Sequence, residues 1–222
     1  MNLLINGVLQ NRELILMRLI AITAVLLCVS CSVANTDRFD ELSEKTKTVV
    51  HYCKSCHSTR EMQRGPLLEG LEVWYLEETL LNFKQGIRGG NPEDKNGQLM
   101  FAAVKDLPEK DIIAAVKWFA GQPRPEIKAY LKGDVKAGEK IYKDSCYGCH
   151  EHPMGKLFSR SPDLYKLEDW YLLSQLRGYK SKVRGSHPED EHGLKMQAGV
   201  QHLTHKDFKD VTAFLAAFQE KP

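Results

Sequence analysis

Apolar residues recur at helical spacing along most of the chain, and no segment alternates between apolar and polar positions as a strand would. Residues 111–120 and 207–218 place apolar side chains three and four positions apart, and Thr204 is suited to cap the second of these helices. Further helices are expected over 74–83, 170–179, 37–52 and 134–145. Loops rich in Gly, Pro and charge are expected over 86–96 and 181–192. The pattern predicts an all-α protein.

The start of the chain has the pattern of a secretory signal. Residues 19–29 form an apolar run that is too short to span a bilayer and follows Arg18. We therefore expect residues 1–34 to be a signal peptide, of which 1–16 are an upstream extension, and the mature protein to be exported. Two outcomes stay open, namely ordinary cleavage after Ala34 and lipid attachment at Cys31, which would tie the protein to a membrane.

Composition excludes several classes of protein. The 222 residues are 42% hydrophobic, with 31 Lys and Arg against 29 Asp and Glu, and the formal net charge is +2. These values are typical of a folded globular protein and argue against a disordered or collagenous chain. Because no long basic run occurs, nucleic acid is not an expected partner.

The second half of the chain repeats the first. Matching residues lie 96 positions apart: Trp74-Tyr75-Leu76 with Trp170-Tyr171-Leu172, Arg88-Gly89 with Arg184-Gly185, and Pro92-Glu93-Asp94 with Pro188-Glu189-Asp190. We therefore expect two homologous domains, residues 35–122 (the first repeat) and 133–222 (the second repeat). Residues 123–132 form the linker between them, after a Gly and Pro segment that ends a helix.

Each repeat carries one Cys-x-x-Cys-His motif, at Cys53, Cys56 and His57 and at Cys146, Cys149 and His150. This motif is the signature of c-type heme attachment, in which two thioethers hold the macrocycle and the histidine binds one face of the iron. A zinc site, a redox-active pair and two disulfides are the alternatives. The disulfide interpretation leaves both histidines unexplained, a redox pair lacks a βαβ context, and zinc lacks further ligands. The sequence predicts two covalently bound hemes c.

The other axial ligand is predicted from the same repetition. Met100 and Met196 are 96 positions apart, and a thioether sulfur is a soft iron ligand. Histidine is the competitor in the second repeat, but the first repeat has no histidine after His57. We therefore expect His57 and Met100 to be the axial ligands of one heme iron, and His150 and Met196 those of the other.

Other matched residues are candidates for contacts around each heme. A backbone carbonyl at Pro66 or Pro162 is placed to accept the N–H of the adjacent ligand histidine. The remaining candidates have ordinary alternatives: the aromatic pairs suit either propionate binding or core packing, and the arginines suit either propionate neutralisation or a solvated loop. They are Trp74, Tyr75, Trp170, Tyr171, Arg88 and Arg184.

These motifs together resemble tandem class I cytochrome c domains, in particular diheme cytochromes of the cytochrome c4 type. The resemblance covers residues 37–219 and includes Gly138 and Tyr142, where the family's first helix meets its last; Lys45 and Val49 replace them in the first repeat. It implies two domains, each wrapped around one covalent heme, and one-electron transfer in the periplasm between redox proteins. The expected route runs from a quinol-oxidising complex to a terminal oxidase or reductase, without catalytic residues. A diheme enzyme, peroxidase-like or thiosulfate-oxidising, is the alternative.

Overall fold

Helices joined by loops build the whole of the described structure. A computed structural model describes residues 39–58 and 63–219, so the predicted signal peptide and the lipid site at Cys31 lie outside the described residues. Within these two ranges there is no strand, in agreement with the predicted all-α fold. None of the helices found there is both long enough and apolar enough to cross a membrane.

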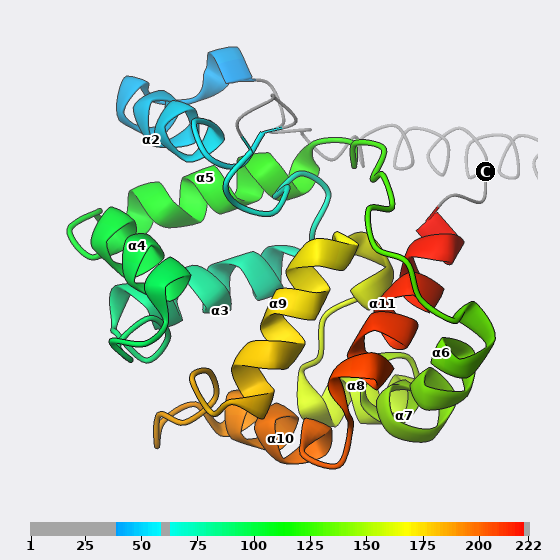
Figure 1. Ribbon diagram of the computed structural model, residues 1–222. Helices are drawn as coiled ribbons and strands as arrows, with labels where there is room; N and C mark the ends of the chain where they lie inside the picture. The colour runs from blue at the N-terminus through cyan, green and yellow to red at the C-terminus, as the bar shows by residue number, and fades with distance from the viewer. Residues whose placement is uncertain (1–38, 59–62, 220–222) are drawn as a thin grey trace, which may run out of the picture. The chain divides into compact units, whose positions relative to one another are not determined.

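The described part of the first repeat contains four α-helices, which Figure 1 shows in blue to green. They follow a short 3-10 turn and are α2 (Glu44–Lys54), α3 (Val73–Lys84), α4 (Lys95–Val104) and α5 (Glu109–Gly121). Helix α5 packs against both α2 and α3, and α4 packs against α3. The side chains buried where these helices meet include Val50, Ile112, Val116 and Phe119.

The second repeat uses the same helix pairing, as Figure 1 shows toward the red end of the chain. Its elements are α6 (Val135–Ile141), a π-helical turn (Tyr142–Cys146), α7 (Tyr147–His150), α8 (Pro153–Ser159), a 3-10 turn (Leu164–Lys166), α9 (Asp169–Lys180), α10 (Glu191–Val200) and α11 (His205–Gln219). Helix α11 packs against α6 and α9, and α10 packs against α9. Helices α6, α9, α10 and α11 therefore correspond to α2, α3, α4 and α5.

The contact between α6 and α11 depends on Gly138. A Cβ atom at Gly138 would lie 2.0 Å from the carbonyl oxygen of Asp210 and 2.8 Å from Cβ of Phe214, so no larger residue fits. The ring of Tyr142, one turn later, lies 5.4 Å from that of Phe214. In the first repeat the matching Lys45 is exposed and Val49 is buried, so α2 meets α5 without this glycine contact.

Local capping explains where the element boundaries differ from the predicted ones. The helix predicted over 37–52 begins only at Glu44, because the Ser43 side chain accepts a hydrogen bond from Thr46 N–H and caps it. The loops predicted over 86–96 and 181–192 end earlier, because Asp94 and Asp190 start α4 and α10. Helices α4, α8 and α10 were not predicted. Each is short, and glycine interrupts its apolar pattern.

The segment predicted as a linker is extended and bonded to both repeats. Arg124 donates hydrogen bonds to the carbonyl oxygens of Leu67 and Glu69 in the first repeat and of Lys166 in the second. The Asp169 carboxylate accepts from the backbone N–H groups of Tyr130 and Leu131, at 2.7 and 2.6 Å. The described residues of both repeats accordingly belong to one compact unit.

Candidate functional site

The first Cys-x-x-Cys-His motif lies at the end of α2, and the second lies after the corresponding helix α6. Cys53 is in the last turn of α2 and His57 follows it, whereas Cys146 ends the π-helical turn and His150 ends α7. The four cysteines of the described ranges are free thiols. Burial raises the pKa of the Cys53 thiol to about 11 and that of the Cys146 thiol to about 12, so both are neutral at pH 7.

The histidines of both motifs are held in the same way. His57 Nδ1 lies 2.6 Å from the carbonyl oxygen of Pro66, and His150 Nδ1 lies 3.1 Å from that of Pro162. Because a carbonyl only accepts hydrogen bonds, Nδ1 carries the proton in each ring and Nε2 keeps its lone pair. Burial lowers the pKa of both imidazoles and keeps them neutral, which is the form that binds a metal.

Gly65 closes one side of the His57 ring. A Cβ atom at Gly65 would lie 2.3 Å from His57 Cε1, so the ring occupies the space that any side chain there would need. In the second repeat Ser161 takes this position, and its hydroxyl lies 2.7 Å from that of Ser159. Each histidine therefore has a proline carbonyl as its partner, but the other neighbours of the two rings differ.

Met100 and Met196 lie on corresponding helices that start with the same cap. Met100 is in α4 and Met196 in α10, and both are half-buried. Asp94 Oδ1 accepts from Gly97 N–H at 2.8 Å, and Asp190 Oδ1 accepts from Gly193 N–H at 2.8 Å.

The glycines of the matched Arg-Gly and Asp-x-x-Gly motifs make this cap possible. Gly89 and Gly185 have φ values of +79° and +71°, which favour glycine. A Cβ atom on Gly97 would lie 2.1 Å from Asp94 Oδ2, and one on Gly193 would lie 2.0 Å from Asp190 Oδ2. The matched Pro-Glu-Asp and glycine positions thus serve to place the methionine helices.

Arg88 is not a solvated loop charge, because it is only 9% exposed. Its Nη2 donates to the Tyr171 hydroxyl at 2.9 Å and to Gln175 Oε1 at 3.0 Å. The guanidinium carbon also lies 4.5 Å from the Phe83 ring centre, as that of Arg184 does from Tyr179. Gln175 also accepts a hydrogen bond from Arg184. The sequence analysis did not identify Gln175 as a site residue, because the residue 96 positions earlier is not a glutamine.

The aromatic pairs have one geometry in both repeats. The rings of Trp74 and Tyr75 are 6.0 Å apart at 70°, and those of Trp170 and Tyr171 are 6.0 Å apart at 75°. Arg160 lies over the Trp74 ring at 5.6 Å. The Tyr171 hydroxyl has a partner from the other repeat, since Arg88 donates to it.

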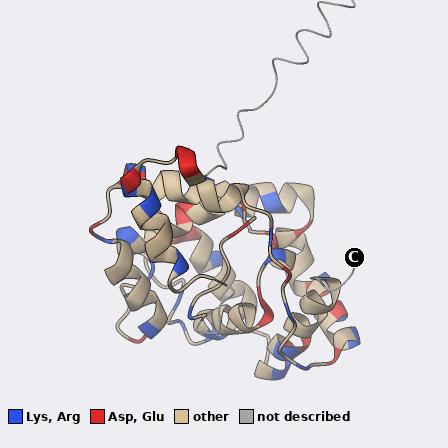
Figure 2. Cartoon of the chain, turned by 90° about the horizontal axis from the view of Figure 1, so that it is seen from above, with Lys and Arg blue, Asp and Glu red and all other residues tan. Residues whose placement is uncertain are grey.

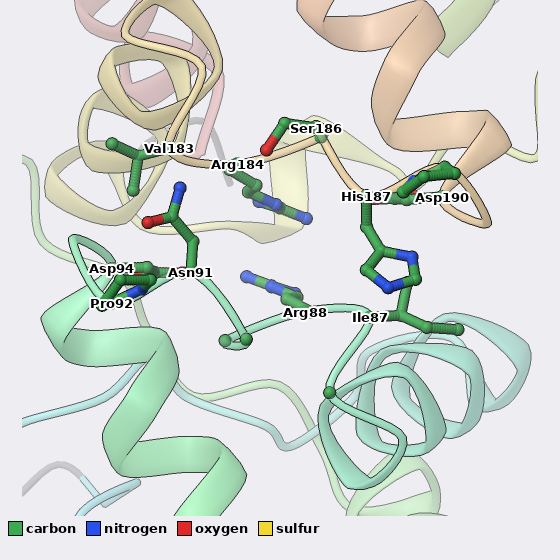
Figure 3. A pocket seen from close by; sticks show the side chains of 15 residues that line it. Ile87, Arg88, Asn91, Pro92, Asp94, Val183, Arg184, Ser186, His187 and Asp190 are labelled. Carbon is green, nitrogen blue, oxygen red and sulfur yellow. The ribbon is translucent and has the colours of Figure 1, made fainter.

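The two Arg-Gly loops face each other across a cavity of about 420 Å³. Figure 3 shows the side chains of Arg88 and Arg184 approaching each other from the two loops, with Asn91 and His187 nearby. Nη1 of Arg88 and Nε of Arg184 are buried and have no hydrogen-bond partner. Neither Cys-x-x-Cys-His motif lines this cavity.

These features fit a covalently attached heme c in each repeat. The free thiols have the spacing for two thioethers, and each anchored imidazole leaves Nε2 available. Buried donors without a partner are rare in folded proteins, and the orphaned nitrogens of Arg88 and Arg184 suit an anionic group such as a propionate.

Comparisons with known proteins agree with this arrangement. Residues 135–219 match the family model described as cytochrome c. The structure is similar to that of cytochrome c4 from Acidithiobacillus ferrooxidans, with a TM-score of 0.57 and 23% identity over 74% of this chain and 97% of that one. The structure is also similar to that of reduced recombinant cytochrome c4 from Pseudomonas stutzeri, with a TM-score of 0.57 and 23% identity over 79% of this chain and 97% of that one.

An enzyme is also among the similar structures. Thiosulfate dehydrogenase from Marichromatium purpuratum gives a TM-score of 0.60 and 23% identity, over 81% of this chain and 40% of that one. A comparison with curated proteins gave no match. Residues 135–219 thus form a cytochrome c domain, and the chain has the fold of a cytochrome c4-like class I cytochrome.

Proposed function

We propose that this chain is a periplasmic diheme electron carrier. Cys53 and Cys56 hold one heme and Cys146 and Cys149 the other, by thioether bonds. His57 with Met100, and His150 with Met196, bind the two irons. A heme held by these residues would supply a one-electron ferric/ferrous couple for transfer from a donor protein to an acceptor protein.

The duplicated histidine anchor carries this proposal. In both repeats a proline carbonyl lies at hydrogen-bond distance from Nδ1 of the motif histidine. This contact fixes the ring and directs Nε2 away from the carbonyl. The methionine helix of each repeat starts with the same aspartate cap, which supports the same types of iron ligand, histidine and methionine, at both sites. An iron with protein ligands on both faces has no open position for a substrate, which favours a carrier.

The partners follow from the class of protein. We propose a quinol-oxidising complex as donor and a terminal oxidase or reductase as acceptor, all at the periplasmic side of the membrane. The charge distribution supports protein partners rather than nucleic acid, because Figure 2 shows basic and acidic residues interspersed over the helices.

A thiosulfate-oxidising enzyme is the second candidate, and the similarity to thiosulfate dehydrogenase favours it. The two candidates differ at the iron, because an enzyme needs one site that is open or differently ligated. Carbon monoxide distinguishes them, since it binds reduced heme only where a ligand position is free or easily vacated.

The experiment is to express the chain in a host that matures c-type cytochromes. The mass of the exported protein reports two hemes, the processing site and any lipid on Cys31. We expect the ferric protein to show the red-region absorption band of methionine ligation at both hemes, the reduced protein not to bind carbon monoxide, and thiosulfate not to be oxidised. Carbon monoxide binding with thiosulfate turnover would establish the enzyme instead.

Substitution of one methionine tests the ligand assignment. Met196→Ala should remove the methionine band of one heme and let carbon monoxide bind there. Met154→Ala is the matched control, because Met154 is 54% exposed on α8 and should leave both hemes unchanged. An unchanged spectrum in Met196→Ala would refute the assignment.

A further inference from the structure

Glu72 and Glu168 occupy matching positions, each directly before the second helix of the shared pattern, α3 or α9. This is the N-cap position, where Ser, Thr, Asp or Asn is preferred because a short side chain reaches the free N–H groups of the helix. Neither glutamate makes a cap hydrogen bond with its own helix. Both carboxylates instead extend to the opposite repeat.

Glu168 is a buried carboxylate whose partners come from the first repeat and the linker. Its side chain is 3% exposed. Oε2 accepts from the backbone N–H of Leu67 at 3.0 Å, and Oε1 accepts from Gln63 Nε2 at 2.5 Å. Arg124 Nη2 lies 3.7 Å from Oε2. Burial raises the pKa of Glu168, whereas the bonds from Gln63 and Leu67 and the charge of Arg124 oppose that rise.

The Leu67 N–H belongs to the same peptide group as the Pro66 carbonyl. That carbonyl oxygen lies 2.6 Å from His57 Nδ1. One planar amide therefore accepts from the imidazole at its oxygen and donates to the Glu168 carboxylate at its nitrogen. A continuous chain of hydrogen bonds joins a charge in the second repeat to the ligand histidine of the first.

The second repeat has the reciprocal arrangement. Glu72 Oε2 lies 3.4 Å from the backbone N–H of Asp163, which shares its peptide group with the Pro162 carbonyl. That carbonyl oxygen lies 3.1 Å from His150 Nδ1. Both distances exceed those around His57. The Glu72 side chain is 19% exposed and lies 3.4 Å from Lys156 Nζ, so its charge is better screened.

We infer that Glu168 and Glu72 are positioning residues that lower the reduction potential of the iron in the opposite repeat, each through one peptide group and one histidine. Linked hydrogen bonds polarise one another, so an anion at the amide N–H makes the carbonyl a stronger acceptor. A stronger acceptor at Nδ1 makes the imidazole a more basic ligand and favours ferric iron. The effect should be larger on the first heme. This inference rests on the proposed function, because it requires His57 and His150 to bind iron.

The test is a redox titration of the holoprotein followed by proton NMR, with the heme methyl resonances of the two repeats assigned separately. Glu168→Gln keeps the shape and the acceptor oxygen but removes the charge. We expect a higher midpoint for the first heme, an unchanged midpoint for the second, and a shifted His57 Nδ1–H resonance in the ferric protein. Glu72→Gln should raise the second midpoint alone, by less.

Glu69→Gln is the control for charge without a hydrogen-bonded path. Its charge also acts on His57, and Oε2 of this carboxylate has no hydrogen-bond partner. A shift in Glu69→Gln as large as in Glu168→Gln would show that charge alone acts and would overturn the inference. So would a first-heme midpoint unchanged in Glu168→Gln. If Glu168→Gln does not accumulate, Glu72→Gln is the deciding variant, because Glu72 is partly exposed. An unchanged midpoint potential of the second heme in Glu72→Gln would then overturn the inference.

Failure of the proposed function would look different. The mass and absorption spectrum would show, before any titration, that the matured protein lacks two histidine-ligated hemes. That result would refute both the proposed function and the inference about Glu168 and Glu72. Two normal hemes with unchanged midpoint potentials would refute only the inference.

Discussion

Arg88 in the first repeat donates a hydrogen bond to the Tyr171 hydroxyl in the second, at 2.9 Å. Arg88 is 9% exposed and Tyr171 is also 9% exposed, so the contact is buried between the repeats. The same guanidinium donates to Gln175 one turn further along α9. Arg88 therefore finds its hydrogen-bond acceptors in the opposite repeat, and the Tyr171 hydroxyl has a donor there.

Loss of the Tyr171 hydroxyl should destabilise the protein. In Tyr171→Phe the buried Arg88 guanidinium loses an acceptor, which we expect to lower the free energy of unfolding by about 1–3 kcal/mol. Denaturant unfolding of the holoprotein measures this change. Tyr130→Phe is the control, because Tyr130 is 66% exposed and its loss should have little effect. Equal stability of the two variants would contradict the role assigned to this contact.

Removal of an aspartate cap should loosen a methionine helix. Asp190→Ala removes the acceptor of Gly193 N–H at the start of α10 and should cost about 0.5–2 kcal/mol. On heating the ferric protein, the red-region methionine band should disappear at a lower temperature than in the wild type. Glu189→Ala, next to it and exposed, should melt like the wild type. Identical melting of both variants would argue against capping.

A side chain at Gly65 should displace the His57 ring. In Gly65→Ala the new Cβ would lie 2.3 Å from His57 Cε1, closer than non-bonded carbon atoms approach. We expect the bond between His57 and the Pro66 carbonyl to be lost, with a lower heme content in the first repeat by mass. Gly199→Ala is the control, because a Cβ there meets nothing within 4 Å. Full heme content in Gly65→Ala would show that the ring can move aside.

Acid should weaken the start of the last helix through Asp207. Its carboxylate accepts from Thr204 N–H at 2.7 Å, and these bonds with Thr204 lower its pKa below the ordinary 3.8. A lowered folded-state pKa gives stability that is complete above the unfolded value and is lost as the pH falls through the folded value. Asp207→Asn should therefore melt below the wild type at pH 7, and the difference should close in acid.

The control for this pH series is Asp106→Asn, because the Asp106 side chain is 85% exposed. Its melting temperature should follow the wild type across the series. If the difference between Asp207→Asn and the wild type were the same at every pH, the charge of Asp207 would not be the cause.

Much of the fold was predictable because duplication separates signal from coincidence. A single apolar segment is ambiguous, but 111–120 and 207–218 occur at matched positions, and both are helices in the structure. The histidine–proline contact followed from the motif spacing for the same reason. The short helices that carry Met100 and Met196 were missed, because their start depends on an aspartate cap and glycine packing rather than on a long apolar stripe.

Contacts between the repeats were not predictable from either copy alone. Glu72 and Glu168 are matched in the sequence, yet a glutamate before a helix suggests an exposed first turn. Only the packing of one repeat on the other buries Glu168 against the Leu67 amide. A signal was available in hindsight, because both glutamates stand at a position that shorter polar side chains usually fill.

The hydrogen bonds of Arg124 change what the segment between the repeats does. A flexible tether would let two redox centres meet by diffusion, at a rate set by its length and by solvent viscosity. A segment whose arginine donates hydrogen bonds to carbonyl groups of both halves is instead a rigid connection. Electron exchange between the halves would then proceed at one fixed separation, and a chain nicked within this segment would remain assembled.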